Sequence, residues 1–130
     1  MSVRIVLASG QNVVDSSGWL EYFADSDAAA PFVAALEDTD RLLVPVVTIY
    51  EVFKFTRRHS DEDEARRVVQ TMRRARVIPL DVELALAAAC NGLPLADSLI
   101  YATALAHGAT LWTQDAHFEG LYGVKYFPKP

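Results

Sequence analysis

The chain has 130 residues, of which 52% are hydrophobic and 22% charged, so it can bury the core of one domain and is not a disordered tail. Its formal net charge of −5 argues weakly against binding nucleic acid through overall charge alone. No apolar run approaches the roughly 20 residues of a membrane-spanning helix, and the single cysteine, Cys90, has no partner for an internal disulfide. We therefore predict a cytoplasmic protein with no membrane segment.

Residues 1–11 hold one early basic residue and an apolar stretch too short for a convincing signal peptide. We interpret them as a leader or an extra edge strand, and place the domain proper at residues 12–130. From residue 12 onward, short apolar runs alternate with helix-forming segments, without repeats or a linker. This alternation predicts a single α/β domain with a mainly parallel central sheet flanked by helices.

The first half of the domain has helix-start signals of hydroxyl or acidic residues, which can cap backbone N–H groups. Thr48 and Glu51 match a capping box, in which each side chain bonds the backbone N–H of the other residue. Pro31 falls in the first turn of its helix, where proline is tolerated. The predicted elements are a strand at 12–14, a helix from Ser16 or Ser17 to about 23, a helix at 28–37, a strand at 41–44, a helix from 48 to about 58, and a helix capped by Ser60 that ends at 72.

The second half begins with an apolar run at 77–80, which Pro79 restricts to a sheet edge or to a short strand. Asp81 is placed to cap the next helix, and Asn91-Gly92 stops that helix. The remaining predicted elements are a helix at 82–90, a helix at 95–107 followed by Gly108, a strand at 110–112, a helical turn at 116–119 and a strand at 124–127.

Four acidic residues each follow a short apolar run at a helix-start signal: Asp15, Glu51, Asp97 and Asp115. The carboxyl ends of parallel strands share one sheet edge, where open α/β sheets bind ligands, so we expect these carboxylates to meet there. Clustered carboxylates repel one another unless a cation lies between them. For any single acid a helix cap is the simpler explanation, and for Glu51 the box with Thr48 suffices. Four acids in one pattern favour a metal site.

The available ligands narrow the identity of the predicted metal. His59, His107 and His117 are scattered and Cys90 is alone, so no zinc-like spacing occurs. A site built from oxygens favours Mg²⁺ or Mn²⁺, which can activate water for attack on a phosphodiester. We interpret His117 as a solvated turn residue rather than a catalytic base.

Basic residues gather between Lys54 and Arg76, a segment that holds eight of the twelve lysines and arginines. A basic helical arm beside an acidic pocket can bind a phosphate backbone and a metal together. Taken alone, the charge run favours a solvated helix pair in which the acids at 61–64 are i,i+4 partners. The arginines that we consider as substrate contacts are Arg66, Arg67, Arg73 and Arg74.

Four segments, in this order, resemble the signature segments of PIN domains, and most closely those of VapC-type toxins of bacterial toxin–antitoxin pairs. They are Val13-Val14-Asp15-Ser16-Ser17, Tyr50-Glu51-Val52, Ala96-Asp97-Ser98-Leu99-Ile100-Tyr101-Ala102-Thr103-Ala104 and Trp112-Thr113-Gln114-Asp115-Ala116-His117-Phe118. The resemblance extends from about Asn12 to the end of the chain.

The resemblance implies an endoribonuclease that depends on Mg²⁺ or Mn²⁺ and acts as the toxin of its pair. Thr113 would lend its hydroxyl to the side of the site between Asp15 and Asp115. Ser16 and Ser98 would contact substrate or a metal-bound water, with plain helix capping as the alternative. The acids implied as catalytic residues and as ligands of one or two metals are Asp15, Glu51, Asp97 and Asp115.

The resemblance further implies three partners: a VapB-like antitoxin, an RNA substrate and a second copy of the chain in a homodimer. The antitoxin would lay an amphipathic segment in an apolar groove and place a basic residue in the acidic pocket. Aromatic residues that offer such a groove, most of them expected in the core, are Trp19, Tyr22, Phe23, Phe53 and Phe55.

One segment departs from the VapC pattern. The stretch from Leu80 to Asp97 is short, because Cys90-Asn91-Gly92 ends its helix early, and this would shift Asp97 relative to the other acids. Mg²⁺ tolerates little error in geometry, so the alternative is a PIN-like module that binds RNA or a partner with weak or no cleavage. A signalling receiver domain fits less well, because only Asp15 follows the first strand and no lysine directly follows the strand that ends at Trp112.

Overall fold

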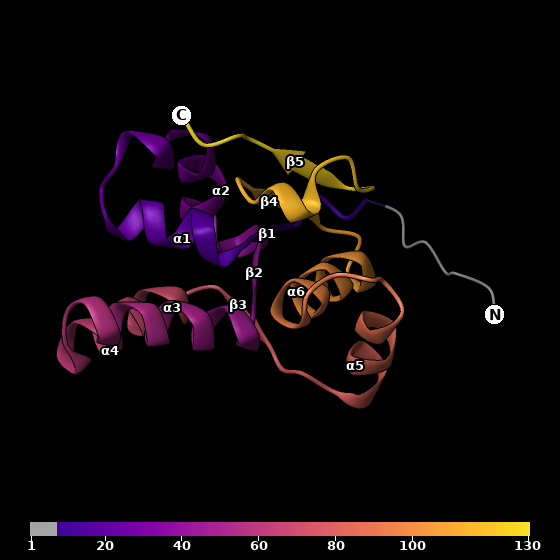
Figure 1. The fold of residues 1–130 in the computed structure, drawn as a ribbon, viewed down its shortest axis with the longest axis horizontal. Coiled ribbons are helices and arrows are strands. Elements are labelled where there is room, and N and C mark those ends of the chain that lie inside the picture. Colours follow the sequence, from indigo (N-terminus) through magenta and orange to yellow (C-terminus); the bar gives the residue numbers. More distant parts are fainter. Residues whose placement is uncertain (1–7) are drawn as a thin grey trace.

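A parallel sheet is the middle layer of the computed structural model, which describes residues 8–130 (Figure 1). Its five strands are β1 Asn12–Val14, β2 Leu42–Pro45, β3 Arg76–Ile78, β4 Thr110–Thr113 and β5 Val124–Tyr126. They lie in the order β3-β2-β1-β4-β5, and all neighbouring strands within the described residues pair in parallel. The predicted α/β class is confirmed, and β3, the strand shortened before Pro79, is at the predicted sheet edge.

Helices cover both faces of this sheet. One apolar cluster packs α5 and α6 against one face, and a second packs α1 to α4 against the other. Adjacent strand residues alternate between the clusters: Val13 belongs to the first and Val14 to the second, and both are fully buried. The α-helices are α1 Ser16–Phe23, α2 Val33–Glu37, α3 Val46–His59, α4 Glu62–Met72, α5 Val82–Ala89 and α6 Leu95–Ala106, and the 3₁₀ helices are η1 Asp27–Phe32, η2 Thr39–Arg41 and η3 Ala116–Phe118.

Residues 1–7 lie outside the described residues, and with them most of the predicted leader or edge strand. Ala8 to Gln11 form no strand, and the backbone N–H of Ser9 donates to the carbonyl of Gly108 at 2.9 Å. The first strand begins at Asn12, as predicted. No helix of the described part of the chain is both long and apolar enough to cross a membrane.

The sequence predicts most of the helices, but it predicts the residues that cap them less well. α1 is capped by Asp15 and α4 by Asp61, rather than by the predicted serines at 16, 17 and 60. A carboxylate is the stronger acceptor for the N–H groups at the positive end of a helix dipole. The helix predicted at 28–37 is η1 followed by α2, because Pro31 has no N–H to contribute to an α-helical turn. The predicted cap at Asp81 is confirmed.

The predicted capping box of Thr48 and Glu51 is wrong. α3 begins at Val46, directly after β2, so both residues lie within the helix instead of flanking its start. Thr48 Oγ1 is buried and has no hydrogen-bond partner among the described residues. Glu51 accepts a hydrogen bond from Ser16 instead. The simplest structural explanation for Glu51 is thereby removed.

Candidate metal centre

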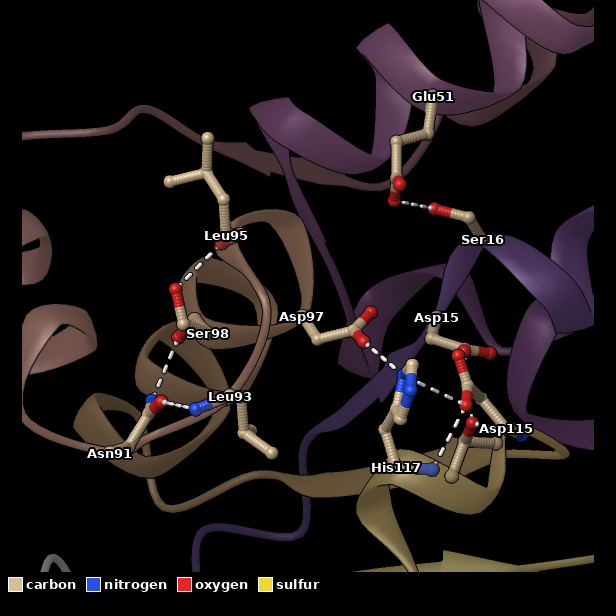
Figure 2. A network of polar contacts seen from close by, with 11 residues as sticks. Asp15, Ser16, Glu51, Asn91, Leu93, Leu95, Asp97, Ser98, Asp115 and His117 are labelled. Atoms are coloured by element: carbon tan, nitrogen blue, oxygen red, sulfur yellow. Dashed lines mark hydrogen bonds and ion pairs between the residues drawn. The ribbon is translucent and has the colours of Figure 1, made fainter.

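The four predicted acids come from four elements that meet where β1 and β4 end (Figure 2). Asp15 directly follows β1 and Asp115 follows β4, and these two strands are neighbours in the sheet. Glu51 lies in α3 and Asp97 in the first turn of α6. The helix predicted from residue 95 is confirmed, so Asp97 lies inside α6 and does not follow a strand. The packing of α6 against the sheet, not a strand end, places this acid.

The short connection before α6 is fixed by the side chain of Asn91, as Figure 2 shows. Asn91 Nδ2 donates to the carbonyl of Ser98 at 3.0 Å, and its Oδ1 accepts from the N–H of Leu93 at 3.1 Å. The residues that end α5 early therefore also clamp the start of α6. Asp97 remains among the other acids despite the short segment.

Asp15 is the most buried of the four acids, with 3% of its surface exposed. Its Oδ1 accepts from Ser17 Oγ at 2.7 Å, and its Oδ2 accepts from Thr113 Oγ1 at 2.9 Å. The Thr113 hydroxyl in turn accepts from the N–H of Asp115 at 2.9 Å. Thr113 thus connects the two acids that follow neighbouring strands.

Burial raises the pKa of Asp15 to about 6, although the hydrogen bonds from Ser17, Thr113 and Gly18 act to lower it. The negative charge of Asp115 adds to the increase. A carboxylate in this position is destabilised in its ionised form, and a nearby cation would relieve it. Such perturbed groups are enriched at functional sites.

Asp97, Asp115 and His117 form the tightest group in the centre. His117 Nδ1 lies 2.8 Å from Asp97 Oδ2 and 3.3 Å from Asp115 Oδ1. One ligand atom from each of these residues lies within 4.8 Å of the other two, a spacing that a single metal ion can bridge. Burial, and then the charge of Asp115, raise the pKa of Asp97, while its hydrogen bond with His117 acts in the opposite direction.

Glu51 approaches the centre from α3, which packs against α1. Its Oε1 accepts from Ser16 Oγ at 2.5 Å, so Ser16 orients the carboxylate rather than capping α1. Burial raises the pKa of Glu51, and the charges of Asp97 and Asp115 raise it further. Glu51, Asp97 and Asp115 therefore interact electrostatically, as expected for carboxylates around one centre.

His117 is a member of the centre that the sequence does not predict. The sequence indicates a solvated turn residue, and the side chain is indeed 58% exposed, but Nδ1 points at Asp97 and Asp115. The signal lies in its spacing. Asp115 Oδ1 accepts from the N–H of His117 at 2.9 Å and so caps η3. In this chain that bond accompanies a ring that lies back toward Asp97 and Asp115.

Ser98 and the arginines of α4 take different positions. Ser98 Oγ donates to the carbonyl of Leu95 at 2.6 Å, within its own helix. Arg66 pairs with Glu62 at 3.3 Å, and Arg67 pairs with Glu64 at 2.7 Å. Arg73 and Arg74 follow α4 and form no ion pair within residues 8–130, and Arg74 lines a cavity with Trp19 and Glu37. A role for any of these four arginines in binding RNA stays a prediction.

The profile of the PIN domain family matches residues 13–124. A chain of a toxin–antitoxin complex from Klebsiella pneumoniae has a similar fold, with a TM-score of 0.75 and 21% identity over 92% of this chain and 100% of that chain. A VapC toxin of Mycobacterium tuberculosis that cleaves the sarcin–ricin loop has a TM-score of 0.72 and 16% identity, over 91% of this chain and 100% of that chain. A chain of a DNA-bound VapBC complex from Salmonella typhimurium has a TM-score of 0.69 and 15% identity, over 95% of this chain and 98% of that chain. No curated protein sequence matches the chain significantly.

Proposed function

The chain belongs to the PIN domain family, and from that premise we propose that it is a divalent-metal-dependent endoribonuclease, the toxin of a toxin–antitoxin pair. The observation that carries the proposal is the unbalanced charge of the centre. Four carboxylates converge there, and within residues 8–130 none of them forms an ion pair with a lysine or arginine. The fold shared with solved toxins, one of which cleaves an RNA loop, supports the same activity.

The donor atoms of the centre fit Mg²⁺ or Mn²⁺. Asp97 and Asp115 offer carboxylate oxygens toward a common point, and Asp15 and Glu51 offer further negative charge around it. Oxygen donors in this number suit hard divalent cations that retain water. When bound, such an ion supplies a Lewis acid that lowers the pKa of a coordinated water and balances charge on the phosphate.

Each side chain has a distinct part in the proposed hydrolysis. Asp97 and Asp115 would hold the ion, and Asp15, fixed by Thr113, would add negative charge from the buried side. Glu51 is oriented by Ser16 through Oε1, which leaves Oε2 to accept the proton of the attacking water. Together these groups place a nucleophile and a phosphate in one small volume, which is a large part of catalysis.

The proposed partners follow from the same activity. RNA is the substrate, a VapB-like antitoxin blocks the centre, and two copies of the chain form a homodimer in the cytoplasm. Toxin chains of this fold occur in solved VapBC complexes, which supports the antitoxin. Protein partners need exposed apolar surface, and the chain presents Val82 and Leu86 on α5 and Leu95 at the start of α6.

The proposal is tested by incubating the pure protein with structured RNAs in Mg²⁺, in Mn²⁺ and in chelator. We expect cleavage with either metal, none in chelator, and loss of cleavage in Asp15→Asn and Asp97→Asn. Asp81→Asn is the matched control: Asp81 also follows a strand, but it caps α5, and asparagine caps as well as aspartate. Cleavage that persists in both site variants would come from a contaminant and would refute the site. RNA binding without cleavage would favour the PIN-like binding module.

A further inference from the structure

We propose that His117 is a nitrogen ligand of the metal centre and that it makes the centre prefer Mn²⁺ to Mg²⁺. This inference rests on the proposed function, because it concerns the same ion. The carboxylates alone do not distinguish these two metals, since both are bound well by oxygen. A ring nitrogen among them changes the donor set.

The spacing of the three donor atoms supports His117 as a ligand. In an octahedral site with bonds of about 2.1 Å, neighbouring donor atoms lie about 3.0 Å apart. His117 Nδ1 lies 2.8 Å from Asp97 Oδ2 and 3.3 Å from Asp115 Oδ1. The distances from Nδ1 to the two oxygens are therefore close to the distance between neighbouring donor atoms in such a site. Without a metal, Nδ1 forms a hydrogen bond with Asp97. A cation held by the two carboxylates would take the place of the Nδ1 proton, which would leave to water.

The turn that carries His117 holds the ring in this place. Phe118, the next residue, is fully buried and anchors η3 in the core. On the other side, Asp115 caps η3 by accepting the N–H of His117. The ring itself is exposed at 58% of its side-chain surface and packs into no core cluster, so core packing does not explain its direction. In Figure 2 it points between the carboxylates of Asp97 and Asp115.

The chemistry of imidazole supports the preference for Mn²⁺. Mg²⁺ strongly prefers oxygen donors and gives up its waters reluctantly, whereas Mn²⁺ lies in the transition series and accepts imidazole nitrogen. A mixed site of two carboxylates and one imidazole therefore gains more affinity for Mn²⁺ than for Mg²⁺. The alternative is that His117 only pairs with Asp97 and Asp115 when no metal is present. In that case it would compete with any cation for these carboxylates.

The experiment measures Mn²⁺ binding to the full chain by electron paramagnetic resonance, and Mg²⁺ binding by its competition with Mn²⁺. We expect His117→Ala to weaken Mn²⁺ binding by about tenfold or more, the usual range for removing a group that supports a metal site, and Mg²⁺ binding by about twofold at most. His59→Ala is the matched control, because His59 is an exposed histidine that bonds the carbonyl of Phe55 within α3. It should leave both affinities unchanged.

A pulsed resonance measurement on the Mn²⁺ protein gives a direct readout. A bound imidazole nitrogen couples to the metal electrons, and this nitrogen modulation should be present in the unaltered protein and in His59→Ala but absent in His117→Ala. The inference would be overturned if His117→Ala bound Mn²⁺ as tightly as the unaltered protein and the unaltered protein gave no nitrogen signal. It would also be overturned if His117→Ala bound either metal more tightly than the unaltered protein.

Cleavage assays run beside these measurements separate the two proposals. A nitrogen signal in a protein that cleaves no RNA with either metal would refute the nuclease and keep the ligand. Cleavage with both metals and no nitrogen signal would refute the ligand and keep the nuclease. Because the ring is largely exposed, His117→Ala should fold normally, which a thermal melt in chelator checks.

Discussion

The metal centre and the α3–α4 helix pair both carry many charges, but only the helix pair balances them. On α4, Glu62 and Glu64 each pair with an arginine within one helical turn. At the centre, Asp15 and Asp97 have pKa values raised mainly by burial and further by the charge of Asp115. Exposed pairs such as those on α4 contribute about 0.3–0.5 kcal/mol each, so they are features of a solvated surface.

This difference shows that the balance of charge, more than its density, points to function. The sequence places eight of the twelve basic residues between Lys54 and Arg76, in and directly after the helix pair, which makes this region look like a binding surface. The structure shows Arg66 and Arg67 occupied by neighbouring acids. The acids of the centre are fewer, with Asp15 buried and the other three partly buried, and folding leaves them in a state that an added cation would stabilise.

The largest expected effect comes from removing one charge at the centre. Asp115→Asn should lower RNA cleavage about a thousandfold, equivalent to roughly 4 kcal/mol of lost stabilisation by the metal. The fold should tolerate the change, because asparagine can still accept the N–H of His117 at the start of η3. Initial rates in saturating Mg²⁺, with a thermal melt of the same sample, check both statements. A variant that cleaves RNA at a tenth of the normal rate or faster would mean that Asp115 is not a ligand.

A second effect, of about 3 kcal/mol, should appear in the pH dependence of stability. Asp15 has a pKa of about 6 in the folded protein, against 3.8 for an ordinary aspartate, so between these values the folded state holds a proton that the unfolded chain has released. Stability of the metal-free protein should therefore fall as the pH rises through this range, by about 3 kcal/mol for a shift of this size. The raised pKa values of Glu51, Asp97 and His117 act in the same direction.

Thermal unfolding in chelator at about pH 4 and about pH 7, on either side of this range, tests this directly. The unaltered protein should melt at the higher temperature in the more acidic buffer. In the less acidic buffer, Asp15→Asn should melt higher than the unaltered protein, and it should depend less on pH, because its amide carries no charge to bury. A variant less stable than the unaltered protein in that buffer would contradict the assigned cause.

A smaller effect, about tenfold in cleavage, should follow from Ser16→Ala. The hydroxyl that orients Glu51 is lost, and a hydrogen bond to a charged group is worth about 1.5–3 kcal/mol. Ser98→Ala is the control, because the Ser98 hydroxyl donates to a carbonyl of its own helix, and the backbone bond from Asn91 to Ser98 is kept in the variant. If both variants cleave RNA at the same rate, Glu51 does not need Ser16 for its part in the reaction.

The smallest effect belongs to the helix pair. Arg73→Ala with Arg74→Ala should flatten the salt dependence of RNA binding, by about 0.7 in slope for each phosphate that these arginines neutralise on single-stranded RNA. Arg66→Ala with Arg67→Ala should change it less, because glutamates already balance these arginines. Binding measured between low and moderate salt in a cleavage-deficient background makes the comparison. Equal slopes in both double variants would leave ion pairing irrelevant to RNA binding.

The sequence predicts the layout of the sheet and helices well, because apolar periodicity survives in the fold. β1 begins at Asn12 and β3 lies at an edge as expected, and Asp81 caps α5. Caps are harder to predict because several polar residues stand near each helix start. At α1 the sequence offers Asp15, Ser16 and Ser17, and only the packed backbone decides which side chain reaches the free N–H groups.

The centre is predictable in outline but not in its contacts. That Asp15 and Asp115 meet follows from strand ends in a parallel sheet, whereas Asp97 arrives on a helix whose position depends on packing. The capping box predicted for Glu51 is wrong because α3 starts two residues before Thr48. The role of His117 is hidden in the sequence, because the direction of a side chain in a tight turn depends on a hydrogen bond that residue spacing suggests only weakly.

The pairing of β1 with β4 also determines when the centre can exist. Asn12 lies opposite Thr110, and Trp112 Nε1 donates to Asn12 Oδ1 at 2.8 Å across 100 positions of sequence. As a ribosome makes the chain, Asp15 and Glu51 emerge long before Asp97, Asp115 and His117 are synthesised. Until β4 joins the sheet, β1 is an edge strand and Asp15 lacks its bond from Thr113. The proposed nuclease centre is therefore assembled only after the segment that carries β4 has been made.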